Sequence, residues 1–222
     1  MHIKTLGTGS SGNTYLLTNG AGHTLIVECG VPAKQMLQAL NSSIMEVDGA
    51  IISHVHSDHA GYVKQYEKYA IPVWRAWEDA PSMKVFGDFT VVSFELPHDG
   101  TENRGFVIRT DSHCLLYMTD FLYSKFTFTS IKPDTILCEC NHQTEYLDAE
   151  EIKYQHSVQG HCDLETCKEF LKANVTDNLK QVVLIHQSRD WLEKGEALAR
   201  ISDVLPESVN LCFAEVGKTI EI

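Results

Sequence analysis

Four side chains that can bind a metal ion fall within the six-residue segment HVHSDH: His54, His56, Asp58 and His59. An apolar run, VDGAIIS at 47–53, leads into this segment and predicts a buried strand that ends at His54. His54 and His56 then share one face, because alternate residues of an extended chain point the same way. The chain turns next, so that Asp58 and His59 face a second position. Two imidazoles for one ion, and a carboxylate plus an imidazole for the next, predict a pair of divalent metal ions.

One short segment cannot enclose two ions, so further ligands are expected at the ends of later strands. Three residues fit, each after an apolar, strand-like run: His98 in LPHDG, Asp120 in YMTD and His186 in VLIHQS. His98 would complete the first ion, Asp120 would bridge both ions, and His186 would complete the second.

The elements that position these residues are read from apolar periodicity and turn signals. Strands are predicted at 2–6, 13–18, 23–28, 47–53, 71–74, 89–96, 104–110, 113–119, 135–139 and 182–185, and helices at 32–41, 61–70, 144–155, 163–173 and 196–204. A β-rich half thus precedes a half in which helices alternate with strands. No repeat or linker-like composition divides the chain. We therefore expect one α/β domain over residues 1–222, a two-sheet sandwich flanked by helices with function at strand ends.

The run GTGSSG at 7–12 also matches the glycine pattern of dinucleotide-binding folds, and Glu28 follows at a plausible distance. A dinucleotide site needs the third glycine to open a helix whose N-terminus holds the pyrophosphate. The residues that follow, NTYLLTNGAGHT, instead carry turn signals and β-type side chains. We predict a tight turn between two strands.

Composition limits the classes of partner. The formal net charge of −12 argues against a broad, sequence-independent grip on nucleic acid, although a local basic groove stays possible. The seven cysteines have no regular spacing, which is typical of free thiols in a reducing cytoplasm. The N-terminus lacks a signal-peptide pattern, and no apolar run approaches the roughly 20 residues of a membrane span. We expect a cytoplasmic protein with no membrane contact; the sequence leaves the oligomeric state open.

The order HxHxDH, then separate His, Asp and His residues, resembles the metallo-β-lactamase superfamily. The closer resemblance is to its YycJ/WalJ-type branch, with PhnP-like phosphodiesterases as neighbours. Besides the GTGSSGN turn, the motifs that carry it are His98-Asp99 before Gly105-Phe106, the TD ending at Asp120, Glu139-Cys140-Asn141-His142, Gly160-His161, and the final L-x-H-x-S at 184–188.

The resemblance implies a four-layer αββα sandwich with the metal pair at one edge, and hydrolysis of phosphodiesters in DNA or RNA. Relatives of this branch include 5′-to-3′ exonucleases on DNA. A hydroxide bridging the two ions would be the nucleophile, oriented by Asp58. His161 is the first candidate for general acid, because it precedes a predicted helix and histidine titrates near neutrality; His142 is the second. Arg189 is a candidate phosphate contact. The ions could be Zn, Mn or Fe, since His/Asp sites accept all three.

Two departures from the family pattern keep other functions open. Glu28 stands where relatives carry Asp, which can shift the support beneath the metal-binding segment. Cys162-Asp163-Leu164 follows the GH motif in place of LSN, which removes polar groups that could contact nucleic acid. The alternatives are hydrolysis of small or cyclic phosphodiesters, hydrolysis of thioesters or lactones on the same fold, and a non-catalytic metal-binding domain. Metal stoichiometry and substrate tests would separate them.

Overall fold

The computed structural model describes residues 1–78, 82–151 and 154–222. Its first sheet has six strands in the order β13-β1-β2-β3-β4-β5, and its second has seven in the order β12-β11-β10-β9-β8-β7-β6. The first sheet comprises β1 (His2–Gly7), β2 (Thr14–Thr18), β3 (Thr24–Val27), β4 (Val47–Ile52), β5 (Val73–Arg75) and β13 (Thr219–Glu221). The second comprises β6 (Met83–Phe86), β7 (Phe89–Leu96), β8 (Asn103–Arg109), β9 (Cys114–Met118), β10 (Thr135–Glu139), β11 (Gln181–Ile185) and β12 (Asn210–Phe213).

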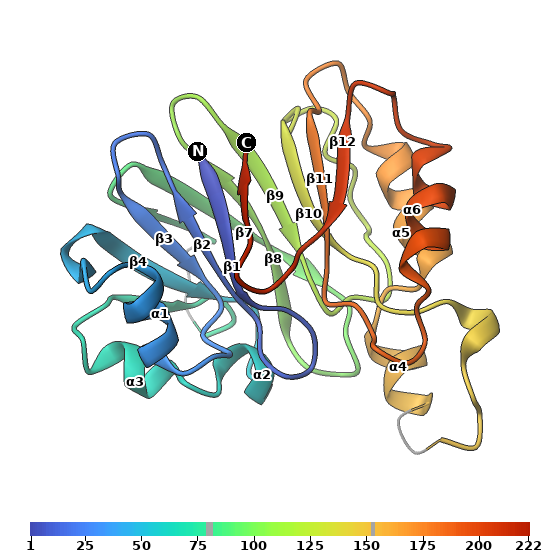
Figure 1. The fold of residues 1–222 in the computed structure, drawn as a ribbon, viewed down its shortest axis with the longest axis horizontal. Helices are drawn as coiled ribbons and strands as arrows, with labels where there is room; N and C mark the ends of the chain where they lie inside the picture. The colour runs from blue at the N-terminus through green and yellow to red at the C-terminus, as the bar shows by residue number, and fades with distance from the viewer. Residues whose placement is uncertain (79–81, 152–153) are drawn as a thin grey trace.

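Helices cover the outer faces of the two sheets (Figure 1). α1 (Ala33–Ala39) and α3 (Val63–Glu67) lie against the first sheet, and α5 (Leu164–Ala173) and α6 (Lys194–Ser202) against the second. The short helices α2 (Ser57–Ala60) and α4 (Tyr154–Gly160) lie at the lower edge in this view. Short 3-10 turns at Ile44–Glu46 and Thr144–Tyr146 join other elements. The predicted αββα sandwich is confirmed.

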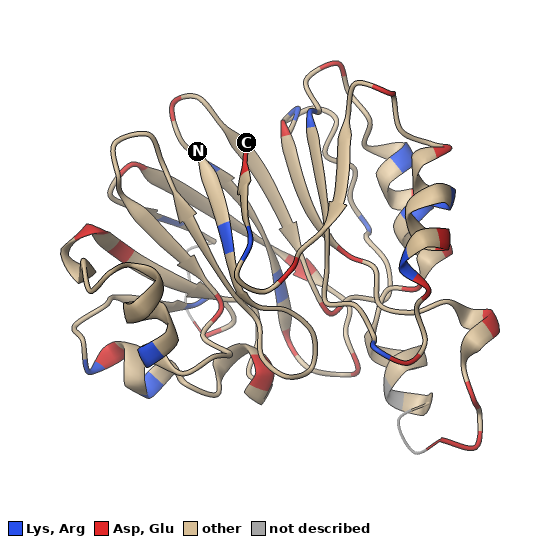
Figure 2. Ribbon diagram, viewed as in Figure 1, with Lys and Arg blue, Asp and Glu red and all other residues tan. Residues whose placement is uncertain are grey.

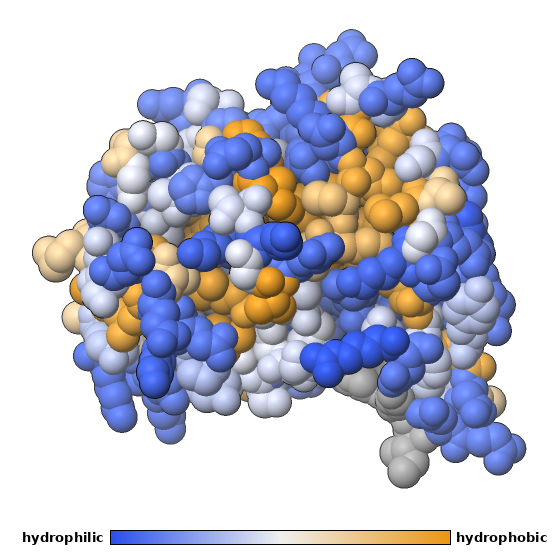
Figure 3. Space-filling model, viewed as in Figure 1, coloured by the Kyte–Doolittle hydropathy of each residue, from blue (hydrophilic) through white to orange (hydrophobic). Residues whose placement is uncertain are grey.

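Three apolar layers hold the four structural layers together. Tyr15 and Leu17 of β2 face the layer between the sheets, whereas Leu16 packs beneath α1 and α3. This alternation follows from the two-residue period of a strand. Strands buried on both faces need near-continuous apolar runs, which is why LIV, AII and VVLI recur in the sequence. Apolar residues also reach the surface in the middle of the molecule, with hydrophilic residues around them (Figure 3).

Parallel pairing brings the ends of distant strands to one edge. β3, β4 and β5 are parallel neighbours, and so are β9, β10, β11 and β12. The carboxyl ends of parallel strands meet at the same edge of a sheet, and the chain leaves β4, β9, β10 and β11 there through its His-, Asp- and Glu-containing segments. None of the described helices is long and apolar enough to cross a membrane.

The predicted strands are present with small shifts at their ends, and the 7–12 run is a turn between the antiparallel strands β1 and β2, as predicted. The short edge strands β6, β12 and β13 were not predicted, because their pairing depends on neighbouring strands more than on their own pattern. The predicted helix at 144–155 is wrong in its first part: 144–146 form a single 3-10 turn, and 147–151 are not helical. Residues 152–153 lie outside the described residues, and α4 begins at Tyr154. The first part presents no buried side to pack on, since Tyr146 is 45% exposed.

Backbone hydrogen bonds connect three segments: the end of the turn between β1 and β2, the loop that follows β3, and the metal-binding segment at 54–59. Asn13 N donates to Asp58 O at 2.7 Å, and Gly30 N donates to Asn13 O at 2.9 Å. A Cβ atom on Gly30 would lie 1.8 Å from Asp58 O and 2.5 Å from Asn13 N. Only glycine therefore allows this close approach.

Gly30→Ala is predicted to lower the free energy of unfolding by about 1–3 kcal/mol or more, the usual cost of overpacking, at about 2–4 °C of Tm per kcal/mol for a chain of this size. Thermal denaturation measures it. Gly20→Ala is the control, since nothing lies within 4 Å of a Cβ at Gly20. A Gly30→Ala protein as stable as this control would contradict the predicted close contact.

Candidate metal centre

Three overlapping groups of potential ligands lie at the sandwich edge, and one of them is formed by Asp120, Glu139, His161 and His186. Of the two groups that contain the predicted ligands, the first has His54, His56, His98 and Asp120, and the second has Asp58, His59, Asp120 and His186. Within each group the ligand atoms lie within 4.8 Å of one another. All seven residues predicted as ligands are thus brought together, and Asp120 is the member that both groups share.

The two carboxylate oxygens of Asp120 are divided between the groups. Oδ2 lies 3.7 Å from Nε2 of His54 and 3.9 Å from Nε2 of His98. Oδ1 lies 3.3 Å from Nε2 of His59 and 3.4 Å from Nε2 of His186. Asp58 joins the second group, with Oδ2 at 3.2 Å from Nε2 of His186. This is the arrangement expected of a carboxylate that bridges two cations.

The orientation of two imidazole nitrogens, in His54 and His98, supports a fit between the donor set and divalent metal ions. Nε2 of His54 is buried and has no hydrogen-bond partner among the described residues. Nε2 of His98 faces Nδ1 of His56 at 3.2 Å, and the Gly160 carbonyl accepts a hydrogen bond from the other nitrogen of His98 at 2.6 Å. In its neutral form His98 therefore directs a lone pair from Nε2 toward the cluster. A buried polar atom without a partner is costly, and a bound cation would remove that cost.

Four buried or half-buried carboxylates give the cluster its negative charge: Glu28, Asp58, Asp120 and Glu139. Burial opposes ionisation of Asp120, but His186 and His59 hold the pKa of this carboxyl well below its usual range. Burial likewise opposes ionisation of Asp58, whose pKa is lowered by hydrogen bonds from His186 and His59. Both groups are therefore ionised at neutral pH and suited to a cation.

The histidines respond to burial and to these carboxylates in two ways. Burial lowers the pKa of His54 and of His98, which keeps both imidazoles neutral and available as ligands. Burial has the same tendency at His186, but Asp120 and the hydrogen bonds to Asp58 and Glu139 raise its pKa to about 10. His186 is therefore protonated and positively charged. A metal ion that binds would displace this proton and supply the positive charge in its place.

The backbone is strained at three of these positions. Glu28, Asp120 and His186 have φ angles of 68°, 50° and 52°. These lie in the left-handed region of the backbone, which residues other than glycine rarely adopt. Glu28 and His186 come directly after β3 and β11, Asp120 is the second residue after β9, and all three are buried. Strain of this kind concentrates at functional sites, where the surrounding fold fixes it.

Glu28, the first departure from the family pattern, lies beneath the metal-binding segment. Its carboxylate accepts hydrogen bonds from Ser53 N at 3.2 Å and Tyr117 Oη at 3.2 Å. Oε1 also lies 3.5 Å from Nδ1 of His59. The longer side chain thus reaches both the strand end and a predicted ligand, and it supports the outer side of His59.

Glu139 is the residue whose importance the sequence analysis missed. Oε1 accepts hydrogen bonds from Nδ1 of His161 at 2.7 Å and from Nδ1 of His186 at 3.1 Å. Oε2 accepts from the backbone of Phe121 at 3.0 Å and of Cys162 at 3.2 Å. The available signal was a carboxylate that ends a fully buried strand, TILCE, because a buried charge must be paired.

The candidate general acids His161 and His142 and the candidate phosphate contact Arg189 lie at different places relative to the ligand groups. His161 joins the cluster: its ring stacks on His186 at 5.1 Å between centroids, and Nδ1 lies 3.9 Å from Asp120 Oδ2. His142 lies outside the ligand groups and contacts Asn141 Oδ1 at 3.3 Å. Arg189 is exposed and lines a hollow together with His161.

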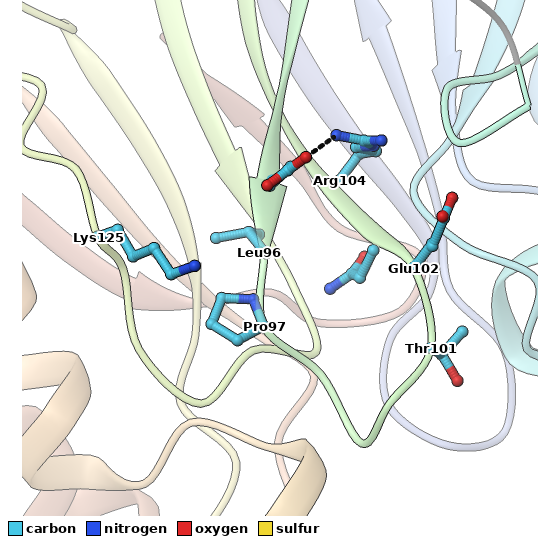
Figure 4. Close-up of a pocket in the computed structure, with 8 residues that line it drawn as sticks. Leu96, Pro97, Thr101, Glu102, Arg104 and Lys125 are labelled. Atoms are coloured by element: carbon cyan, nitrogen blue, oxygen red, sulfur yellow. Dashed lines mark ion pairs between the residues drawn. The ribbon is translucent and has the colours of Figure 1, made fainter.

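Hollows flank the cluster on both sides. One of about 490 Å³ lies beside His161, and one of about 450 Å³ lies beside His98. A smaller hollow of about 270 Å³ lies along the segment that follows His98 (Figure 4). There Arg104 pairs with Glu95 at 3.3 Å, and Lys125 extends toward Leu96. This third hollow contains none of the predicted ligands.

The fold and the site together define a metal-dependent hydrolase. Residues 7–131, more than half of the chain, match the metallo-β-lactamase superfamily, and the chain belongs to this family. The family resemblance seen in the sequence is confirmed, and the fold of this family implies divalent metal ions.

Two curated relatives match most of the chain. Exodeoxyribonuclease YycJ of Bacillus anthracis is 27% identical over 240 residues, covering 93% of this chain and 90% of the relative. Exodeoxyribonuclease WalJ of Streptococcus pneumoniae is 25% identical over 218 residues, covering 83% and 81%. These are the relatives to which the sequence motifs pointed.

Solved structures show the same fold. The metallo-β-lactamase fold protein YhfI from Bacillus subtilis has a TM-score of 0.77 at 17% identity and covers 99% of this chain and 98% of that one. A diphosphatase of the PhnP family has a TM-score of 0.66 at 15% identity, with 100% and 97% covered.

Glu139→Gln is predicted to weaken metal binding about 10–100-fold, because the carboxylate that orients His186 loses its charge while its size is kept. Calorimetric titration with Zn²⁺ or Mn²⁺ measures the affinity. Glu95→Gln is the control, since Glu95 is exposed and pairs only with Arg104 among the contacts described above. Unchanged affinity in Glu139→Gln would show that this carboxylate does not support the metal centre.

Proposed function

We propose that this protein is a phosphodiester hydrolase with two divalent metal ions, and that it degrades DNA from strand ends. The observation that carries the proposal is the division of the Asp120 oxygens between two adjacent ligand groups. The named activity of two relatives, which match 93% and 83% of the chain, supports exonuclease action on DNA. The direction proposed is 5′-to-3′, by resemblance to the YycJ/WalJ-type branch.

When bound, two divalent ions lower the pKa of water from about 15.7 toward about 7 and polarise phosphoryl oxygens. Of these ions the site could take Zn, Mn or Fe, since imidazole and carboxylate ligands suit all three. His54, His56, His98 and Asp120 would hold one ion, and Asp58, His59, His186 and Asp120 the other.

Asp58 is proposed to orient the attacking water. Its side chain is 18% exposed, whereas Asp120 is only 2% exposed, so that Asp58 is the carboxylate at the solvent side of the cluster. Oδ2 is fixed by Nε2 of His186 at 3.2 Å and by Nδ2 of Asn13 at 3.4 Å. A fixed carboxylate at this position can accept a hydrogen bond from water and direct its lone pair.

His161 is proposed to donate the proton that the leaving oxygen needs. Glu139 accepts a hydrogen bond from Nδ1, which leaves Nε2 as the atom that can hold and release a proton. His161 also lines the 490 Å³ hollow, where a substrate can reach it. His142 is the weaker candidate, because it lies outside the ligand groups.

A second candidate function is hydrolysis of a small or cyclic phosphodiester. The distribution of charge favours it: the chain carries a formal net charge of −12, and Lys and Arg alternate with Asp and Glu along α5 and α6 (Figure 2). A long nucleic acid needs a basic footprint, whereas a single phosphodiester does not. Turnover of a 2′,3′-cyclic mononucleotide without degradation of DNA would favour this function. Thioester or lactone hydrolysis has no comparable support from the site.

Asp58→Ala is predicted to reduce the rate at which end-labelled linear duplex DNA is degraded by more than roughly 100-fold. Loss of a residue that only orients a metal ligand costs up to about 100-fold, and Asp58 is proposed to bind metal and to orient water. The assay contains added Mn²⁺ or Zn²⁺, and a chelator should abolish the wild-type reaction. Asp88→Ala is the matched control, because Asp88 is exposed and bonds to Asn19. Retained activity in Asp58→Ala with both metals bound would contradict the assigned role. Inactive wild-type protein with bound metals would contradict action on DNA.

A further inference from the structure

One buried amide contacts the backbone of Asp120, the residue whose carboxylate is shared by the two groups of predicted ligands. Asn103 is the first residue of β8 and is 3% exposed. Its Nδ2 donates hydrogen bonds to the carbonyl oxygens of Thr119 at 2.9 Å and of Asp120 at 2.5 Å. Two successive carbonyls therefore converge on one side chain, which lies outside the set of predicted ligands.

The sheet does not supply these hydrogen bonds. The ladder between β8 and β9 ends at the Phe106–Tyr117 pair. Asn103 and Asp120 each lie three residues beyond this pair, where β9 has ended and the backbone of Asp120 has a φ of 50°. A buried carbonyl that has left a ladder needs another donor. The primary amide of Asn103 has two N–H donors, one for each carbonyl.

The second polar atom of the same amide indicates what the side chain contributes. Oδ1 of Asn103 is buried and has no hydrogen-bond partner among the described residues. A leucine, which is of similar size, would avoid the cost of this unsatisfied acceptor. The favourable hydrogen bonds of the amide group are thus those that its nitrogen makes to the backbone at 119 and 120.

Two further contacts fix neighbouring atoms of the same turn. Thr119 Oγ1 donates to Oδ1 of Asp120 at 2.7 Å, and the Glu139 carboxylate accepts a hydrogen bond from Phe121 N at 3.0 Å. A residue with a side chain stays in the left-handed region only when the surrounding structure holds it there. Among these contacts, those from Asn103 reach the carbonyl of Asp120 itself.

The segment that carries Asn103 is also attached to the first ligand group. Arg104 N donates to Ser53 O at 3.1 Å, and Ser53 directly precedes His54. The start of β8 therefore contacts the end of a strand in each sheet: β4 through its backbone and β9 through the Asn103 amide. A displacement at this point would change the position of Asp120 relative to His54.

We infer that Asn103 is a positioning residue for the metal centre: its amide holds the backbone of Asp120 in the conformation from which the carboxylate faces both groups of predicted ligands. This inference rests on the two-metal site of the proposed function and adds the contact that keeps the shared carboxylate in place. Without the amide, the backbone at Asp120 can leave the left-handed region, and the carboxylate turns away from the ligand groups. Both ions then lose the ligand that they share.

The test compares Asn103→Leu with Asn174→Leu, its matched control. Asn174 is 0% exposed, accepts a hydrogen bond from Phe128 N at 2.6 Å and donates one to Phe170 O at 2.8 Å. It directly follows α5, a helix of 10 residues, or about 15 Å, whose other end lies near His161. Each substitution thus removes a buried amide with two hydrogen bonds to the backbone, one at the metal centre and one away from it.

Calorimetric titration with Zn²⁺ measures the affinities, and electron paramagnetic resonance of the Mn²⁺-loaded protein measures the magnetic coupling between the ions. Asn103→Leu is expected to bind both ions about 10–100-fold more weakly, the usual effect of losing a residue that orients a metal ligand. Its coupling between the ions is expected to be weaker than in the wild type. Asn174→Leu is expected to lose thermal stability but to keep the wild-type affinities and spectrum. If a leucine variant does not fold, Asn103→Ala and Asn174→Ala are compared instead.

Failure of the inference and failure of the proposed function are distinguishable. Wild-type affinities and coupling in Asn103→Leu, or an equal loss of both in Asn174→Leu, would overturn the positioning role and leave the proposed function standing. Wild-type protein that binds two ions without degrading linear DNA would contradict the proposed function, and weaker binding in Asn103→Leu alone would still support the positioning role. Wild-type protein that binds a single ion would overturn both.

Discussion

The carboxylate of Asp120 lies between two sets of imidazoles, with one oxygen toward each set. An ionised carboxylate that is only 2% exposed needs positive charge close to it. The rest of the edge is arranged around this requirement. Glu139 holds His161 and His186, Glu28 supports His59, and the Gly160 carbonyl orients His98. His59, His98 and His186 each use Nδ1 for such a contact, and Nε2 of each faces the shared carboxylate.

The fold provides this arrangement by ending several parallel strands at one edge. Asp120, Glu139 and His186 each lie at or just beyond the end of a strand in the second sheet, whereas His54 follows a strand of the first. Residues far apart in the sequence thus meet where the backbone changes direction. The positive φ angles at Asp120 and His186 show that the direction of the chain at this edge is set by the site as well as by the sheets.

Much of this arrangement could be predicted from the sequence. Apolar runs that each end in His or Asp indicated both the strands and the ligands, because burial and period-2 alternation leave clear patterns. Glu139 was named only within a family motif and given no role, because a carboxylate at the end of a buried strand gives no sign of its partners, which are His161 and His186. The helix predicted at 144–155 was wrong in its first part for the opposite reason. The local residues favour a helix, but residues 144–151 bury no face against the rest of the protein. The contacts between the 8–12 turn and the 186–189 segment join residues 178 positions apart, which periodicity cannot reveal.

The most direct test of the shared carboxylate is a crystal structure of the metal-loaded protein with anomalous scattering measured at the absorption edge of the ion. The account predicts two peaks about 3.5–4 Å apart, on either side of Asp120, one near His54 and one near His186. A single peak, or two peaks that leave Asp120 without contact to one of them, would contradict it.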